Sequence, residues 1–259
     1  MKSPLAFLLL LYRIWVGIVF IVSMIFYFPG IVIPFLFGQR FGSIGYFFLR
    51  LWSWTFSLLT LIRYRFYGRE NIRRNQSYIF VSNHTSFLDL PGLTMLIPGQ
   101  YRPLAKKELL KIPVFGWITK SAAVVVDRSS PESRKRSMDR LKSLLLHGIS
   151  ILIFPEGTQN RTTQVLQPFR DGAFRIAIDT QQPVLPLVIL GAGPLMPPGT
   201  INLKPGLIRI YCGEEISTTE LTTQDTRELK DRTFAIMADM IHSQQDGVRK
   251  TTTRNHSGT

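Results

Sequence analysis

An apolar run near the amino terminus constrains the fold of this chain more than any other feature. Residues 4–28 are almost wholly apolar and contain one charged side chain, that of Arg13. The run is long enough to cross a bilayer, which takes roughly 20 residues in a helix. It is too long for the apolar core of a cleaved signal peptide, and no small-residue cleavage site follows it. We therefore expect a retained helix that enters a membrane.

A second apolar run, rich in aromatic residues, follows the first. Two prolines and a glycine within residues 29–34 predict the end of the first helix, and residues 38–45 predict a turn. The second run covers residues 41–62 and is interrupted by Arg50. Either both helices span the bilayer as a hairpin, or both lie partly sunk in one leaflet. The arginines and the many aromatic rings favour the shallow arrangement, and residues 1–62 are predicted to be a two-helix membrane segment.

From residue 63 onward, short apolar runs alternate with helical patterns. Six of these runs predict strands, at residues 64–67, 78–81, 122–126, 150–154, 184–190 and 207–211. Three segments predict helices, at residues 131–146, 171–181 and 223–244. Near-continuous apolar strands are typical of sheets covered on both faces. We therefore predict a layered α/β (αβα) domain over residues 63–246 with a mostly parallel central sheet, and a disordered tail over residues 247–259.

Charge and cysteine content narrow the functional classes. The net charge of +14 draws the chain to anionic surfaces, either nucleic acid or acidic lipid headgroups. Its aromatic residues gather in the apolar segment rather than among the basic residues of the second half, so no nucleic-acid partner is expected. The single cysteine, Cys212, excludes an internal disulfide and favours a reducing compartment. No cluster of histidine and cysteine predicts a metal site, and no glycine-rich nucleotide loop is present.

A histidine and an aspartate follow directly on one of the predicted buried strands. His84 and Asp89 are five residues apart, which on a regular helix is ~140° of rotation, so they would not share a helix face. His84 must then lie in the loop or first turn, with Asp89 reaching back from the helix. In that geometry the carboxylate takes the Nδ1–H of the imidazole and leaves Nε2 free as a base. The same residues also suit an ordinary helix cap, in which His84 has no role.

A second polar turn is predicted at the same edge of the sheet. The strand that ends at residue 154 runs into Pro155, Glu156, Gly157 and Thr158. Backbone N–H groups, an acid and a hydroxyl in such a turn can hold a polar headgroup or support an oxyanion. An ordinary turn would use the same proline and glycine.

Taken together, these residues resemble the glycerolipid acyltransferases, the family of bacterial 1-acyl-glycerol-3-phosphate acyltransferase. Four motifs in the family's order carry the resemblance, which covers roughly residues 63–215. They are Asn83-His84-x4-Asp89; Lys106-Lys107-Glu108-Leu109 with Pro113-Val114-Phe115-Gly116 and Val126-Asp127-Arg128; Phe154-Pro155-Glu156-Gly157-Thr158 through Arg161 to Pro168-Phe169-Arg170-Asp171-Gly172-Ala173; and Val184-Leu185-Pro186-Leu187.

The resemblance implies an acyltransferase domain and a reaction without a covalent enzyme intermediate. His84, oriented by Asp89, would deprotonate the hydroxyl of a lysophospholipid acceptor, which attacks the thioester of acyl-CoA or of acyl carrier protein. No cofactor beyond that co-substrate is implied. Lys106 and Arg128 match the family's phosphate-binding positions.

The resemblance also implies where the substrates lie. The substrate-binding set would be completed by Glu156, Gly157, Thr158 and Arg161. A pocket between the N-terminal helices and the α/β domain is expected to measure the acyl chain. We expect the enzyme at the cytoplasmic membrane, bound to the phospholipid bilayer, with its site on the cytoplasmic face.

Two departures from the family pattern leave the acceptor open. Gln159 stands where arginine is usual, and Asp171 stands where a basic residue is common. A neutral amide does not balance the charge of a phosphate. The first hypothesis is therefore acyl transfer to 1-acyl-glycerol-3-phosphate, giving phosphatidic acid. The alternatives are transfer to another lysolipid, such as a lyso-aminolipid, and, from a different class, a non-catalytic protein that binds anionic lipid or nucleic acid.

Overall fold

A seven-stranded sheet forms the centre of the molecule. The structure is a computed structural model, which describes the backbone of residues 4–256 and the side chains of residues 4–245. The strands are β1 (Ile62–Tyr67), β2 (Ile79–Ser82), β3 (Tyr101–Lys106), β4 (Val124–Val126), β5 (Ser150–Ile153), β6 (Val184–Leu190) and β7 (Gly206–Cys212). They lie in the order β1-β7-β6-β2-β5-β3-β4, and only the β6–β7 pair is antiparallel. The predicted α/β fold with a mostly parallel sheet is confirmed.

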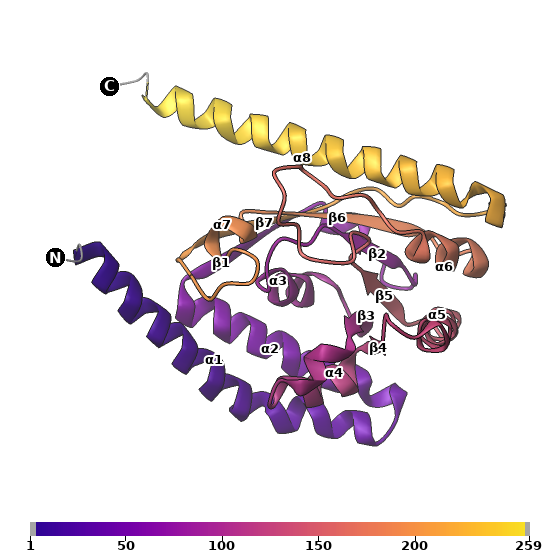
Figure 1. The fold of residues 1–259 in the computed structure, drawn as a ribbon, viewed down its shortest axis with the longest axis horizontal. Coiled ribbons are helices and arrows are strands. Elements are labelled where there is room, and N and C mark those ends of the chain that lie inside the picture. The colour runs from indigo at the N-terminus through magenta and orange to yellow at the C-terminus, as the bar shows by residue number, and fades with distance from the viewer. Residues whose placement is uncertain (1–3, 257–259) are drawn as a thin grey trace.

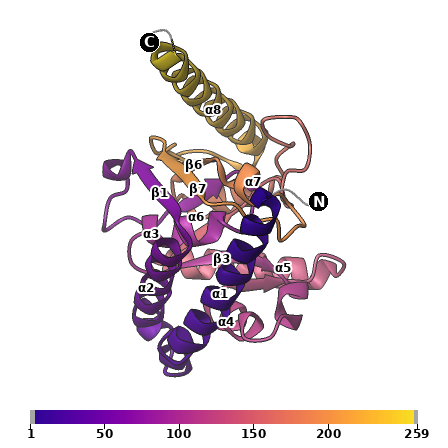
Figure 2. The same cartoon turned by 90° about the vertical axis from the view of Figure 1, so that its left-hand side faces the viewer.

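Helices cover both faces of this sheet (Figures 1 and 2). They are α1 (Pro4–Leu36), α2 (Gly42–Thr60), α3 (Asp89–Leu96), α4 (Phe115–Ala122), α5 (Pro131–Leu146), α6 (Gly172–Thr180), α7 (Ala192–Leu195) and α8 (Thr226–His256). Short 3₁₀ turns lie at Gln39–Phe41, Arg69–Asn71, Lys107–Lys111 and Thr223–Asp225. Alternate strand residues point to opposite faces, so Phe80 and Leu152 pack toward α1–α4, whereas Ile79 and Ile151 pack toward α5, α6 and α8.

The first helix does not end where the sequence predicts. α1 continues through Pro29 and Pro34 to Leu36. An interior proline costs about 3 kcal/mol because it removes a hydrogen bond to the preceding turn. Packing against α2 offsets this cost, since Gly30 lies so close to the ring of Phe48 that a Cβ would meet it at 2.6 Å. The predicted break at residues 29–34 was therefore wrong.

Two N-terminal helices form, as predicted, but they differ in character. By length and composition α1 can cross a membrane, and among the described helices it is the single candidate. α2 instead packs between α1 and the α/β domain, and Arg50 donates hydrogen bonds to the carbonyls of Thr94, Ile97 and Gly99 at the end of α3. The arginine in the second apolar run is thus explained by this contact and gives no evidence for a shallow position in the membrane.

Two further segments differ from the predictions made from the sequence. β3 was not predicted, because it contains Pro103 and two basic residues and lacks an apolar pattern. The strand pairs with β5 before Leu104 and with β4 from Leu104 on.

The tail predicted to be disordered from Gly247 instead continues α8 to His256, because one glycine weakens a helix by about 1 kcal/mol without ending it. Residues 257–259 of that predicted tail lie outside the described residues.

Candidate active site

His84 lies in the loop that joins the carboxyl end of β2 to α3. Its Nδ1 is 2.8 Å from Oδ2 of Asp89, the first residue of α3. The same oxygen accepts the backbone N–H groups of Thr85 and Ser86, at 2.8 and 2.9 Å. A carboxylate in the first turn of a helix is also stabilised by the helix dipole. The predicted arrangement, a histidine in the loop with the aspartate reaching back, is confirmed as geometry.

The second ring nitrogen of His84 is free. Because the carboxylate of Asp89 can only accept, the Nδ1 that faces it carries the proton, and Nε2 keeps its lone pair. Nε2 has no hydrogen-bond partner among the side chains that the structure describes, and the residue lines a large cavity. The ring stacks on Phe154, with centroids 4.0 Å apart and an interplanar angle of 17°. This geometry can take a proton from a group that enters the cavity.

Hydrogen bonds to β6 and its following loop fix the His84 loop in place. The side-chain amide of Asn83 donates to the carbonyl of Ile189 at 2.9 Å and accepts the N–H of the same residue at 2.7 Å. The hydroxyl of Ser86 donates to the carbonyl of Met196 at 2.8 Å. These bonds explain the asparagine and the serine of the first motif as positioning residues.

Glu156 lies behind the site and not on its surface. Its Oε1 accepts the backbone N–H of His84 at 3.0 Å, and its Oε2 accepts that of Gln167 at 2.9 Å. Burial raises the pKa of the Glu156 carboxyl, and the two hydrogen bonds act in the opposite direction. The side chain does not line the cavity. Both oxygens join the two loops, which is a positioning role that the sequence did not predict, and the substrate contact of Glu156 stays a prediction.

Cationic side chains form one end of the same cavity. Lys106, Arg128 and Arg161 line it together with His84. Burial lowers the pKa of Lys106, and the positive charge of Arg128 lowers it further. Burial likewise lowers the pKa of Arg128, whose guanidinium donates to the carbonyl of Gly157. An anionic group bound here would relieve this repulsion.

The turn after β5 brings a further arginine to this end. Gly157 has a φ of 78°, and a Cβ at this position would lie 2.6 Å from Nε of Arg170. Only glycine therefore allows both the turn and the close approach of the guanidinium. Arg170 adds to the positive field, since it lowers the pKa of both Lys106 and Arg128. The sequence did not single out Arg170, although its position within the third motif could have indicated it. Thr158 lines the cavity as predicted.

The two departures from the family pattern have different structural explanations. Gln159 lines the cavity, and its buried amide nitrogen has no hydrogen-bond partner among the described residues. This N–H group is available as a neutral donor beside the cations. Asp171 forms an ion pair with Lys230 of α8 at 2.8 Å, and this pair lowers the pKa of the aspartate. Asp171 therefore joins α6 to α8 and does not line the cavity.

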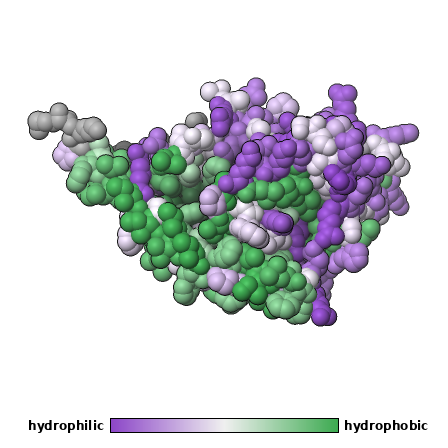
Figure 3. Space-filling view, turned by 60° about the horizontal axis from the view of Figure 1, so that its bottom comes forward, coloured by the Kyte–Doolittle hydropathy of each residue, from purple (hydrophilic) through white to green (hydrophobic). Residues whose placement is uncertain are grey.

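The cavity extends from His84 into the apolar region between the sheet and the N-terminal helices. Its volume is about 1070 Å³. Apolar side chains of α1, α2 and α4 form part of its wall, among them Met24, Trp52 and Ile118. The pocket predicted between the N-terminal helices and the α/β domain is therefore present. On the outside, the surface formed largely by these helices is mostly apolar (Figure 3).

Among the residues whose side chains the structure describes, no three histidine, cysteine, aspartate or glutamate side chains lie close enough to hold a metal ion. The polar residues that line the cavity include His84, two glutamines, several residues with hydroxyl groups, and cationic side chains.

Comparisons with known proteins find acyltransferases among the proteins that are similar to this chain. A family model described as Acyltransferase matches residues 63–190. The chloroplastic 1-acyl-sn-glycerol-3-phosphate acyltransferase BAT2 of Brassica napus is 34% identical over 82% of this chain and 61% of its own length. The human 1-acyl-sn-glycerol-3-phosphate acyltransferase alpha is 32% identical over 71% of this chain and 65% of its own length. The chain thus spans less than two thirds of either relative. The similarity to the Acyltransferase family is carried by residues 63–190.

The fold is shared with a solved structure of that kind. The crystal structure of the 1-acyl-sn-glycerophosphate acyltransferase PlsC from Thermotoga maritima superposes with a TM-score of 0.77, covering 91% of this chain and 95% of that one. The identity is 22%, so the likeness concerns the fold. It includes at least part of the helices that precede the sheet, since the uncovered 9% of the chain is much shorter than residues 1–62.

Proposed function

We propose that this chain is a membrane-bound 1-acyl-glycerol-3-phosphate acyltransferase that produces phosphatidic acid. The observation that carries the proposal is the pairing of His84 with Asp89 at the mouth of an apolar cavity whose polar end is cationic. An imidazole with a free Nε2 suits proton abstraction, the cations suit a phosphate, and the apolar wall suits a fatty chain. The names of the relatives support the same reaction.

In the proposed reaction His84 acts as a general base. Its Nε2 takes the proton of the acceptor hydroxyl while that oxygen attacks the thioester carbonyl of acyl-CoA or acyl carrier protein. The new C–O bond forms and the C–S bond breaks. The thiolate leaves and receives the proton from His84, which restores the neutral imidazole. Asp89 holds the ring and stabilises the imidazolium that forms between the two steps.

The phosphate of the acceptor would bind to Lys106, Arg128 and Arg161. Arginine offers two parallel N–H groups to a phosphate, and each charged hydrogen bond contributes roughly 1.5–3 kcal/mol. Gln159 does not remove this site, because three cations remain around it and its own amide N–H adds a donor. This supports lysophosphatidic acid over a zwitterionic lysolipid as the acceptor.

Membrane association follows from α1, which is long and apolar enough to cross a bilayer. The lysophospholipid would reach the cavity from the membrane. We further propose that this is the cytoplasmic membrane and that the site faces the cytoplasm, where acyl-CoA and acyl carrier protein are available. No cofactor is needed beyond the thioester.

A purified full-length protein in detergent tests the proposal. It is supplied with radiolabelled acyl-CoA or acyl carrier protein thioester and, in parallel, with lysophosphatidic acid or lysophosphatidylethanolamine. We expect labelled phosphatidic acid from the first acceptor. Labelled phosphatidylethanolamine with no phosphatidic acid would overturn the assignment of the acceptor while leaving acyl transfer intact.

A further inference from the structure

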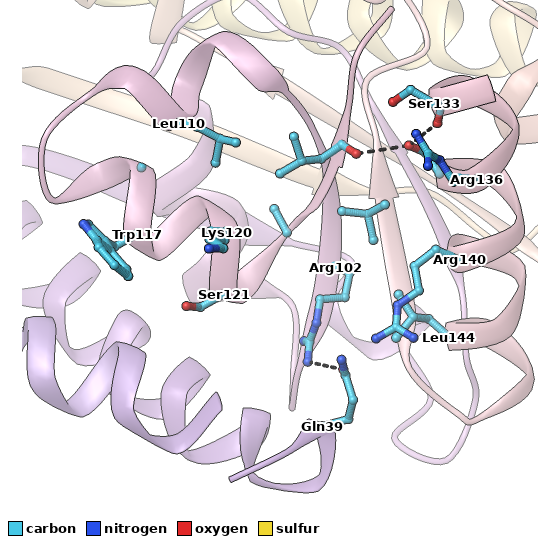
Figure 4. A pocket seen from close by; sticks show the side chains of 15 residues that line it. Gln39, Arg102, Leu110, Trp117, Lys120, Ser121, Ser133, Arg136, Arg140 and Leu144 are labelled. Atoms are coloured by element: carbon cyan, nitrogen blue, oxygen red, sulfur yellow. Dashed lines mark hydrogen bonds between the residues drawn. The ribbon is translucent and has the colours of Figure 1, made fainter. Parts of the chain in front are cut away.

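A second cavity lies on the outer side of α4, between that helix and α5 (Figure 4). Its volume is about 730 Å³. Side chains of α4 and α5 form its two sides, and Arg102 of β3 and Gln39, which follows α1, lie at one end. We call it the outer pocket. Neither His84 nor any of the cations assigned to the acceptor phosphate lines it.

The outer pocket is strongly basic. Lys120 projects from α4, and Arg136 and Arg140 project from α5 toward it. None of the three side chains forms a hydrogen bond or an ion pair within the part of the chain whose side chains the structure describes. No carboxylate lines the pocket. Glu132 lies one turn before Arg136 on α5, and its pKa is lowered mainly by hydrogen bonds of its own, with a smaller contribution from that arginine.

A buried arginine adds a fourth positive charge at one end of the pocket. Arg102 is 2% exposed, and its guanidinium donates to the carbonyl of Tyr101 and the amide oxygens of Gln39 and Gln100. All three acceptors are neutral, so they satisfy the hydrogen bonds of the guanidinium without neutralising its positive charge. Burial lowers the pKa of Arg102, and the positive charge of Arg140 contributes in the same direction. A pocket with this set of charges is complementary to an anion.

The surroundings of the outer pocket indicate that this anion belongs to a lipid. Trp117 lines the pocket and is 61% exposed, and Nζ of Lys120 lies 5.8 Å from the centroid of its ring. The neighbouring Leu110 is also exposed. Exposed tryptophan beside lysine is typical of the boundary between lipid chains and headgroups. Gln39 follows the end of α1, where Leu36 and Phe37 are exposed, so the pocket adjoins apolar surface.

We propose that the outer pocket binds the phosphate-bearing headgroup of an anionic phospholipid in the membrane surface. The cations Lys120, Arg136 and Arg140 would contact the phosphate, and Trp117 would lie against the start of the acyl chains. This inference does not depend on the acceptor or on the reaction of the His84 site. It gives the basic residues of the outer pocket, which contribute to the net charge of +14, a defined role.

A binding measurement tests the proposal with the full-length protein in neutral-detergent micelles. Phosphatidylglycerol with brominated acyl chains is titrated in, and the quenching of Trp117 is obtained as the difference between the protein and its Trp117→Phe variant. We expect saturable quenching. The triple variant Lys120→Gln/Arg136→Gln/Arg140→Gln should need on the order of a hundredfold more phosphatidylglycerol, because each basic residue contributes about a factor of five near an anionic surface.

A matched variant controls for net charge. Arg74→Gln/Lys135→Gln/Arg232→Gln removes the same number of charges from exposed positions that do not line the pocket, and it should bind like the parent protein. Equal binding by both triple variants would overturn the proposal, as would equal quenching by brominated phosphatidylcholine. Displacement of phosphatidylglycerol by micromolar coenzyme A would also overturn it, because the pocket would then be a site for a soluble phosphate. Thermal unfolding of each variant shows that it is folded.

Discussion

The two cavities on either side of α4 differ in how their charges are held. On the inner side, Asp89 and Glu156 are buried acids that fix the backbone around His84, and cations occur at one end of a largely apolar wall. On the outer side, the cations line a pocket without any acid among the lining residues. The inner arrangement fixes the position of one reactive atom, whereas the outer arrangement offers charge to a ligand. The inner cavity is therefore suited to catalysis, whereas the outer pocket is suited to binding an anionic ligand.

The short helix α4 lines both cavities, because residues on its two faces point to opposite sides. Ile118 and Ala122 of α4 face the inner cavity, whereas Trp117, Lys120 and Ser121 face the outer pocket. Residues three and four apart lie on the same helix face, so the two sets alternate along the chain. Substitutions on the two faces of α4 can therefore be compared within the same local structure.

The largest expected effect is the loss of turnover in His84→Ala. Removal of a general base lowers the rate by roughly 10²–10⁴-fold. The variant should keep its thermal unfolding temperature, because His84 donates no side-chain bond other than that to Asp89 among the described residues. Turnover is measured with a labelled thioester and lysophosphatidic acid. Retention of full activity would show that the inner cavity does not use an imidazole base.

Arg128→Gln is expected to have the next largest effect, and Arg136→Gln on the other side of α4 is its control. Loss of charged hydrogen bonds to the acceptor phosphate should lower kcat/KM by about 10- to 100-fold. Arg136 lines only the outer pocket, so its substitution should leave kcat/KM unchanged in neutral detergent. Equal losses in the two variants would mean that general positive charge, rather than the inner site, attracts the acceptor.

Glu156→Ala should lower the free energy of unfolding, and by more than Glu132→Ala. Two buried backbone N–H groups, those of His84 and Gln167, would lose their acceptor, at about 1–3 kcal/mol of unfolding free energy. Glu132→Ala removes an exposed acid from the first turn of α5 and should lower the free energy of unfolding less than Glu156→Ala does. Denaturant unfolding of both variants measures the difference. A smaller effect at Glu156 than at Glu132 would contradict the role assigned to the buried acid.

Much of the inner site, and the start of α5, could be predicted from local sequence, because the contacts that fix them are short-range. The hydrogen bond from His84 to Asp89 spans one loop, and Ser130 caps α5 by accepting the N–H of Ser133. Each of these contacts joins residues close in sequence, and their residue types have strong local preferences. The role of Glu156 could not be predicted in the same way. Its partner His84 lies 72 residues away, and the choice between a substrate and a backbone N–H depends on the fold.

The outer pocket could not be predicted from local sequence either, because its contacts join residues that are far apart in the chain. Arg102 belongs to the strand that the sequence did not predict, and its partner Gln39 lies 63 residues away. A buried arginine in a strand becomes favourable only through partners that tertiary structure brings to it. The break predicted at Pro29 failed likewise, since the contact between Gly30 and Phe48 that offsets the proline joins two separate helices.

The smallest expected effect is a change in acyl-chain preference when α4 is enlarged on its inner face. Ala122 lines the inner cavity and is buried, so Ala122→Leu would occupy part of the space open to a fatty chain. Exclusion of a methylene from an apolar pocket changes kcat/KM by about tenfold or more. Ser121→Leu adds an apolar side chain to the adjacent position, which faces the outer pocket. A series of thioesters of increasing chain length compares the two variants, and only Ala122→Leu should lose activity toward the longest chains. If both variants shift the preference equally, the cavity does not measure the chain at α4, and the effect reflects a general change in the packing of that helix.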